Sequence, residues 1–226
     1  MNFGRIVTAM VTPFNQNNEL DLLATKQLVH HLIANGSDAI VVGGTTGESP
    51  TLTANEKLSL FQTVIEAAAG KVPIILGTGS NNTSASIELT KQAEELGADA
   101  VMLVAPYYSK PSQEGLYQHF KTIAAATHLP VMLYNIPGRS AINLEVNTVL
   151  RLAQVDNIVA IKEASGDLDA MAAIIEGTPD SFSLYSGDDS MTVPVLSIGG
   201  KGVVSVASHI IGPHMQQMIH SFLAVK

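Results

Sequence analysis

The sequence of 226 residues contains no cysteine. The chain therefore has no disulfide framework and no thiolate ligands for a metal ion. Charged side chains are also scarce, at 14% of the chain, and their formal net charge is −8. Because nucleic-acid-binding proteins need basic patches, this charge argues against a nucleic-acid partner.

Long hydrophobic runs are missing as well. None reaches the roughly 18 residues of a membrane-spanning helix, and residues 1–5 lack the pattern of a signal peptide. We therefore expect a soluble protein without a membrane partner, located in the cytoplasm. The histidines are scattered, and the adjacent pair His30 and His31 diverges on a helix, so we expect no metal site.

Apolar side chains, in contrast, make up 46% of the chain. This composition excludes a disordered chain and suits parallel strands that are buried on both faces. The length fits one large core, since α/β barrels of about 200–250 residues form a single domain. We expect one domain over residues 1–226.

Short apolar runs alternate with amphipathic stretches along the sequence. The runs are apolar almost throughout, as expected for strands that are covered on both faces. Eight runs leave about 28 residues per repeat, the size of one βα unit. The pattern predicts a closed (β/α)8 TIM barrel, with an open doubly wound sheet as the alternative. The expected strands are residues 6–10, 39–42, 73–76, 100–104, 131–134, 158–161, 182–185 and 203–206.

The intervening stretches predict helices. Thr53 and Glu56 form a capping-box pattern, which marks a helix start. The apolar face expected for this helix consists of Leu58, Phe61, Val64 and Ile65. The face expected for the last helix consists of Ile211, Met215, Met218, Ile219 and Phe222.

In a barrel of this kind, the chemistry lies at the carboxyl ends of the strands. The most informative residue there is Lys162, the only one of nine lysines that ends an apolar run of the core. A nucleophilic lysine has to be neutral, and burial lowers its pKa toward the neutral range. Such an amine condenses with a ketone to give an iminium that withdraws electrons from the next carbon. The alternative is a structural ion pair with Glu163 or Asp188.

The turn after the second expected strand has the sequence Gly-Gly-Thr-Thr-Gly at residues 43–47. It lacks the lysine of a phosphate-binding loop and the spacing of a dinucleotide fingerprint, so we reject a nucleotide site. Its amides and hydroxyls suit a small nest for a carboxylate. The alternative is an ordinary turn between a strand and a helix.

Two further side chains stand at expected strand ends. Tyr134 lies one strand before Lys162, where a phenol can move protons to and from an amine or imine. Arg139 follows in a loop of proline and glycine and can clamp an anion. The alternatives are a half-buried core tyrosine and a surface arginine.

Three segments resemble a known family. They are Gly-Thr-Thr-Gly-Glu at residues 44–48, Tyr-Asn-Ile-Pro-Gly-Arg at 134–139 and Ile-Lys-Glu-Ala-Ser at 161–165. All three look like 4-hydroxy-tetrahydrodipicolinate synthase, also called dihydrodipicolinate synthase, and the likeness runs from Phe3 to about Ile211. N-acetylneuraminate lyase, in the same superfamily of class I aldolases, shares the lysine, the tyrosine and the glycine–threonine loop, whereas Arg139 points to the synthase.

The resemblance implies a role for each matching residue. Lys162 would form a Schiff base with pyruvate, without a cofactor. Arg139 would bind the carboxylate of aspartate semialdehyde. Proton transfer and pyruvate binding would fall to two further groups. Protons would be relayed by Tyr134, Thr45 and Tyr108, the last from a neighbouring subunit. The pyruvate carboxylate would be held by Thr46 and the amides of its loop, and the pocket would be lined by Gly187 and Val204.

The resemblance also implies lysine and diaminopimelate biosynthesis by a homo-oligomer, a dimer or a tetramer. Members of the family continue past the barrel into a C-terminal helical segment, which we expect to be absent from this chain. Two alternatives stay open beside an active synthase. One is a truncated barrel that binds pyruvate but turns over weakly or not at all, and the other is a different pyruvate-dependent aldolase.

Overall fold

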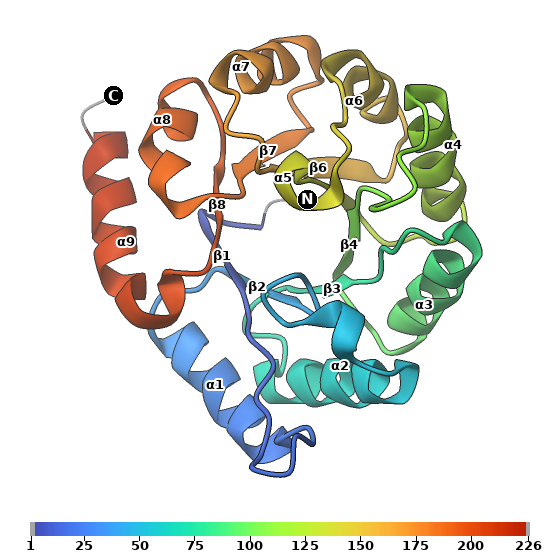
Figure 1. Cartoon of the computed structure of the whole chain (residues 1–226). Coiled ribbons are helices and arrows are strands. Elements are labelled where there is room, and N and C mark those ends of the chain that lie inside the picture. The colour runs from blue at the N-terminus through green and yellow to red at the C-terminus, as the bar shows by residue number, and fades with distance from the viewer. Residues whose placement is uncertain (1–2, 225–226) are drawn as a thin grey trace.

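The computed structural model describes residues 3–224, and its eight parallel strands form a closed barrel in chain order (Figure 1). β1 pairs with β8, which closes the sheet and rules out the open doubly wound alternative. The predicted strands agree with the structure to within one or two residues. The strands are β1 (Ile6–Ala9), β2 (Ala39–Val42), β3 (Ile74–Gly77), β4 (Ala100–Val104), β5 (Val131–Asn135), β6 (Ile158–Glu163), β7 (Ser183–Ser186) and β8 (Gly202–Ser205).

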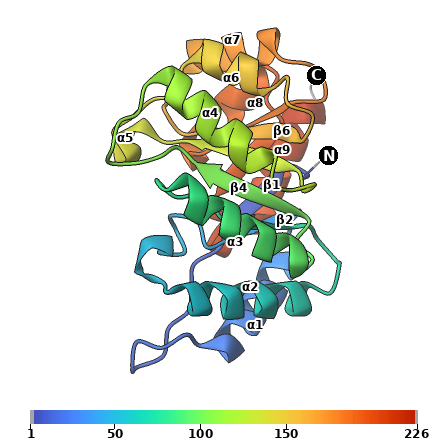
Figure 2. The same ribbon diagram turned by 90° about the vertical axis from the view of Figure 1, so that its right-hand side faces the viewer.

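Helices surround the barrel, and Figure 2 shows α2, α3 and α4 side by side along its outer face. The predicted capping box is confirmed, because Thr53 and Glu56 each accept the hydrogen bond that the pattern requires at the start of α2. The helices are α1 (Leu22–Ala34), α2 (Ala54–Ala68), α3 (Thr83–Glu95), α4 (Gln113–Ala124), α5 (Pro137–Ser140), α6 (Val146–Leu152), α7 (Leu168–Gly177), α8 (Thr192–Ser197) and α9 (Ser208–Ala224), with short 3-10 turns at Ser49–Thr51 and Asp189–Met191.

The two predicted helix faces are correct only in part. In α2, Leu60 is fully buried although the predicted face omits it, and Leu58 is only half-buried. In α9, Met215 and Ile219 are buried, whereas Ile211 and Met218 are exposed. The backbone at Ile211 is not helical, and this bend changes the direction of the face before the regular part of the helix begins.

Side chains alternate between two apolar layers, as strands require. In β5, Met132 and Tyr134 belong to the cluster inside the barrel, whereas Val131 and Leu133 pack in the cluster between the barrel and the helices. Each strand thus presents one face to the barrel interior and one to the helices. Near the carboxyl end of a strand, the inward face is the one available for chemistry.

β6 contains one irregularity that decides which way its last residues point. Val131 pairs with Ile158, but Met132 pairs with Ala160, so Val159 is an extra residue on β6. Ile158 faces the helices, and strict alternation from it would also turn Lys162 toward them. The extra residue shifts the alternation by one position, because Ala160 lies in the inner cluster and Ile161 in the outer one. Lys162 therefore points into the barrel.

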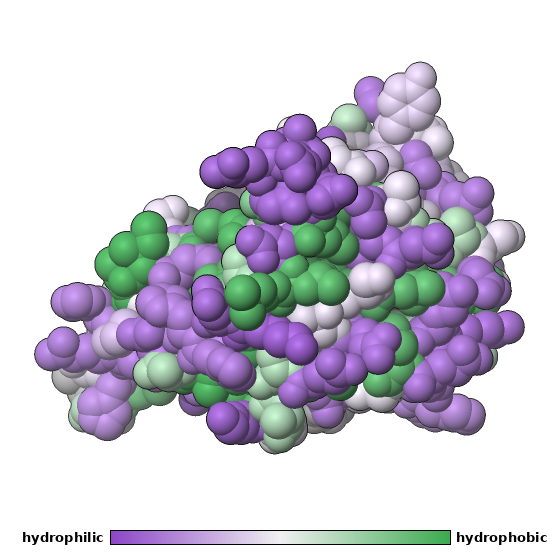
Figure 3. Space-filling model, turned by 90° about the horizontal axis from the view of Figure 1, so that it is seen from below, coloured by the Kyte–Doolittle hydropathy of each residue, from purple (hydrophilic) through white to green (hydrophobic). Residues whose placement is uncertain are grey.

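The side of the molecule near α1 is mostly hydrophilic, with hydrophobic residues in small groups (Figure 3). Leu22 and Leu23, at the start of α1, are exposed apolar side chains. Within residues 3–224, no helix is both long and apolar enough to cross a membrane.

Candidate active site

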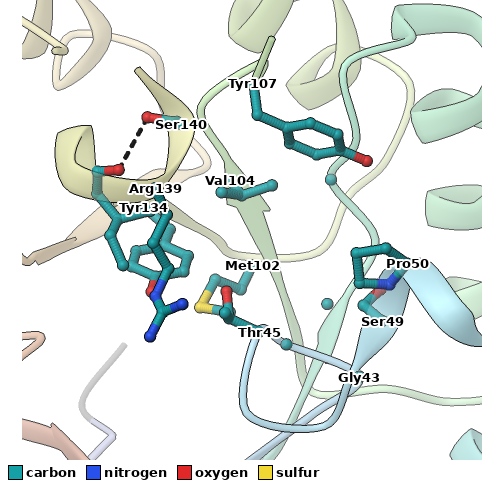
Figure 4. A pocket seen from close by; sticks show the side chains of 14 residues that line it. Gly43, Thr45, Ser49, Pro50, Met102, Val104, Tyr107, Tyr134, Arg139 and Ser140 are labelled. Carbon is teal, nitrogen blue, oxygen red and sulfur yellow. Dashed lines mark hydrogen bonds between the residues drawn. The ribbon is translucent and has the colours of Figure 1, made fainter. Parts of the chain in front are cut away.

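A cavity of about 230 Å³ lies at the carboxyl ends of the strands. Figure 4 shows Thr45, Tyr134 and Arg139 with their polar ends pointing toward one another in this cavity. Most of the lining is apolar, with a few hydroxyl groups and one guanidinium group, as is typical of a small-molecule site. The lining residues are Gly43, Gly44, Thr45, Ser49, Pro50, Gly77, Gly79, Met102, Val104, Tyr107, Tyr134, Ile136, Arg139 and Ser140.

Lys162 lies directly beside Tyr134. The two residues are register partners on β6 and β5, and the Nζ atom of Lys162 is 4.1 Å from the centre of the Tyr134 ring. Lys162 is only 4% exposed, and it is not itself among the residues that line the cavity. The amine therefore sits behind the phenol ring, inside the barrel.

Burial changes the acid–base behaviour of Lys162. Loss of hydration lowers the pKa of its amine from 10.5 to about 8, and Arg139 acts in the same direction. The carboxylates of Asp188 and Asp189 act in the opposite direction, and the effect of burial is the larger one. Within residues 3–224, Lys162 forms no ion pair, so the alternative of a structural pair with Glu163 or Asp188 is wrong.

Tyr134 has the properties of a proton carrier that is held in place. Its phenol forms a hydrogen bond with the side chain of Thr45, and burial raises its pKa above the ordinary value of 10.0. The phenol is therefore protonated at neutral pH and can donate. The structure thus brings three predicted residues, Thr45, Tyr134 and Lys162, to one point.

Of the other predicted residues, only one lines the cavity. Arg139, in α5, lines the cavity from its rim. Tyr108 has a positive φ of 76° and is 87% exposed, so its side chain points away from the cavity of its own chain. Thr46, Gly187 and Val204 are not among the lining residues, and their part in binding stays a prediction.

The sequence analysis missed the role of Asp189. Its carboxylate accepts hydrogen bonds from the Ser205 hydroxyl and from the backbone N–H groups of Val206 and Ala207, at 3.1 and 2.9 Å. It thus joins the segment after β7 to the start of α9 and holds a negative charge near Lys162. The double aspartate after the seventh predicted strand was the signal, but its partners come from the next unit of the barrel.

Among residues 3–224, no cluster of three or more histidine, aspartate or glutamate side chains is placed to hold a metal ion. The polar groups that line the cavity are the phenols of Tyr107 and Tyr134, hydroxyls, backbone amides and a guanidinium group, and the amine of Lys162 lies beside the Tyr134 ring.

A closed parallel barrel that buries a lysine of lowered pKa beside a protonated tyrosine defines a lyase of the class I aldolase type. Comparison with known sequences identifies the family. Residues 2–224 match the dihydrodipicolinate synthetase family, and the chain belongs to it.

Three relatives illustrate the similarity. The 4-hydroxy-tetrahydrodipicolinate synthase 1 of Halalkalibacterium halodurans is 69% identical over 99% of this chain and 76% of its own length. A solved dihydrodipicolinate synthase from Bacillus anthracis is 61% identical with a TM-score of 0.99, over 100% of this chain and 77% of that one. The enzyme of Acinetobacter baumannii, solved in complex with pyruvate, is 42% identical with a TM-score of 0.95, over 99% of this chain and 77% of that one.

Two substitutions of charged residues near Lys162 should shift the pKa of its amine in opposite directions. Asp188→Asn removes an attraction for the ammonium form, so the pKa of Lys162 should fall further. Arg139→Gln removes a repulsion, so that pKa should rise. Both side chains are exposed, so each change should stay below about one pH unit, the equivalent of ~1.4 kcal/mol.

The measurement is the pH dependence of the acylation of Lys162 by a trace of acetic anhydride, resolved by residue with mass spectrometry. Lys91, on an exposed part of α3, serves as the internal reference. Midpoints that move in the same direction in both variants would contradict this electrostatic assignment.

Proposed function

We propose that the chain condenses pyruvate with L-aspartate 4-semialdehyde to give 4-hydroxy-tetrahydrodipicolinate, through a Schiff base on Lys162, in the biosynthesis of lysine and diaminopimelate. The observation that carries the proposal is the buried amine of Lys162 at 4.1 Å from the centre of the Tyr134 ring. With a pKa of about 8, roughly one amine in ten is neutral at pH 7, against about one in three thousand at the ordinary value.

The first half of the reaction uses the amine and the phenol together. The lone pair of the Lys162 amine attacks the ketone carbon of pyruvate, and the ketone oxygen takes up a proton to give a carbinolamine. Loss of this hydroxyl as water leaves a protonated imine. Tyr134 is protonated and bonded to Thr45, so it can supply the proton that water needs to leave. Loss of a proton from the methyl group then gives an enamine.

The second half forms the carbon–carbon bond. The enamine carbon attacks the aldehyde of the second substrate, whose oxygen becomes a hydroxyl as it takes up a proton. The amino group of that substrate then displaces the Lys162 amine from the imine carbon, which closes the ring and frees the enzyme. Thr45 and Tyr134 stand at the point where these protons move.

The two carboxylates of the substrates would have separate binding groups. The turn after β2, with Gly43, Gly44 and Thr45 at the cavity and Thr46 beside it, offers amides and hydroxyls for pyruvate. Arg139 at the rim offers a bidentate partner for the acceptor. The Acinetobacter baumannii relative was solved with pyruvate, which supports pyruvate as a ligand of this fold.

We also propose that the active form is at least a dimer. Tyr108 is 87% exposed on a strained backbone, and its phenol does not reach the cavity of its own chain. In a homo-oligomer it would reach the site of a neighbouring subunit and extend the Thr45–Tyr134 pair. The cytoplasmic location expected from the sequence stays a prediction.

Pyruvate with borohydride should add a single covalent adduct, and it should map to Lys162. Lys162→Ala should abolish trapping while the circular dichroism spectrum stays unchanged. A coupled turnover assay on the same preparation separates an active synthase from a barrel that only binds pyruvate. An adduct on another lysine, or none on folded protein, would sink the mechanism.

Replacing the guanidinium at the rim should affect the acceptor and spare pyruvate. Arg139→Ala should lower kcat/KM for aspartate semialdehyde by about ten- to a hundredfold, because a charge-assisted hydrogen bond is worth about 1.5–3 kcal/mol. Trapping by pyruvate should change little. Equal or better turnover with N-acetylmannosamine would instead place the chain with the lyases of the superfamily.

Association can be tested through Tyr108. Sedimentation should give a dimer or a larger species, and Tyr108→Phe should lower kcat without changing the sedimentation coefficient, because only the hydroxyl is lost. Mixing Tyr108→Phe with Lys162→Ala should then restore part of the activity, since some sites combine two intact contributions. A fully active monomer would refute the proposal.

A further inference from the structure

A second polar cluster lies directly behind the catalytic pair. Asn135 and Glu163 follow Tyr134 and Lys162 in the sequence, and they are the next register partners along the ladder of β5 and β6. Because side chains alternate, they lie on the face of the barrel that the helices cover. Their exposed fractions are only 1% and 2%, which is unusual for an amide and a carboxylate.

Hydrogen bonds use the whole side chain of Asn135. Its Nδ2 group donates to the Glu163 carboxylate at 2.9 Å and to the Asn143 amide oxygen at 2.8 Å. Its Oδ1 atom accepts from the backbone N–H of Leu144 at 3.0 Å. The other Glu163 oxygen accepts from the backbone N–H of Ser165 at 2.7 Å.

These bonds fix the orientation of the amide. The Leu144 N–H can only donate, so Oδ1 of Asn135 has to face it and the NH2 group has to face Glu163. Each oxygen of Glu163 faces an N–H donor, and the Ser165 hydroxyl bonds to the same carboxylate, so the carboxylate is an acceptor on both sides. The arrangement leaves no equivalent alternative in which the amide is flipped.

Packing alone does not hold these two side chains. A second cavity, of about 210 Å³, lies next to them, and both Asn135 and Glu163 line it, together with Asn143 and Ser165. The ladder between β5 and β6 is itself irregular at Val159. On the side of this cavity, side-chain hydrogen bonds therefore connect the two strand ends where close-packed neighbours do not.

We propose that Asn135 and Glu163 form a positioning pair that holds the Lys162 amine against Tyr134 and anchors the end of the segment 137–144, which carries Arg139. The inference rests on the proposed function, because it assigns the reaction to Lys162 and Tyr134. One arm of the pair runs through Glu163 to β6. The other arm runs through Asn143 and Leu144, which close the segment after α5.

Two single substitutions test the pair, and each exchanges a hydrogen-bond donor and acceptor in one of the two side chains. Glu163→Gln places an NH2 group against a donor, either Asn135 or Ser165. Asn135→Asp places a second carboxylate against Glu163. The charges that shift the pKa of Lys162 come from Asp188, Asp189 and Arg139, so neither change acts mainly through that pKa. Each should lower kcat about ten- to a hundredfold, the effect of a small misplacement of a reacting group.

The pH profile adds a readout that a purely structural role would not move. In Asn135→Asp, two adjacent carboxylates share a proton more readily as the pH falls. The shared proton restores the hydrogen bond, so the activity of this variant relative to the unaltered protein should rise toward low pH. Glu163→Gln has no such pair. Burial, and to a lesser extent Asp167, raises the pKa of Glu163 in the unaltered protein, so the ratio for Glu163→Gln should change less and only at the lowest pH.

The double variant Asn135→Asp with Glu163→Gln exchanges amide and carboxylate. The carboxylate introduced at position 135 then accepts from Leu144 and from the new amide, the amide oxygen accepts from Ser165, and Asn143 turns its NH2 group toward position 135. This exchange should return kcat to within about threefold of the unaltered protein, since every bond is again formed. It should also remove the pH effect.

Thr90→Val is the matched control. The hydroxyl of Thr90 forms a 2.8 Å bond with Thr78 between α3 and the end of β3, and both residues are buried. Its loss should lower the midpoint of urea unfolding without changing kcat. Single variants that behave like this control, unstable but with unchanged kcat and pH profile, would overturn the proposal.

A folded double variant without activity would overturn it as well. If a single variant does not fold, recovery of both fold and kcat in the double variant supports the pair. Pyruvate trapping by the unaltered protein is measured first. Absence of trapping would refute the proposed function. Normal trapping, together with variants whose kcat and pH profile are unchanged, would refute only the positioning pair.

Discussion

The structure depends on the register between β5 and β6, which fixes where one amine is buried. An ammonium ion inside a barrel loses most of its hydration, and this loss brings the pKa of Lys162 down to about 8. The same register places the amine against the Tyr134 ring, and burial raises the pKa of the Tyr134 phenol further above neutral pH. A lysine at the surface of the same barrel would remain an ammonium ion and be inert as a nucleophile.

The two faces of the strands carry different tasks. The proposed reaction uses the inward residues Tyr134 and Lys162, and the outward residues Asn135 and Glu163 connect the strand ends to the loops. Loops supply the remaining charges. Asp188 and Asp189 oppose the effect of burial on Lys162, so the pKa of its amine is lowered only to about 8 and the amine can be charged or neutral near neutral pH. In the proposed mechanism the reacting groups therefore stand on rigid strands, and the charges of the loops adjust the pKa of the amine.

Much of this architecture follows from local sequence. Strands that are buried on both faces are apolar throughout, so all eight of them were predictable, as was the capping box at Thr53. A lysine at the end of such a strand is costly to bury and therefore conspicuous, which is why Lys162 was predicted. Thr45, Tyr134 and Arg139 were found because parallel strands all end at the same edge of the barrel.

Other features exist only in three dimensions. Nothing in the run from Ile158 to Ile161 reveals that Val159 is an extra residue, because its four apolar side chains fit either register. Asn135 and Glu163 are 28 residues apart, and Asp189 is 16 residues from Ser205, so their pairing requires the closed barrel. Tyr108 likewise has a positive φ, and its backbone N–H donates to the carbonyl of Ser140 in α5. The sequence by itself determined which residues can react, since that is a property of each side chain and of its strand. Tertiary structure decided which of them meet, because contacts between distant segments form only when the barrel closes.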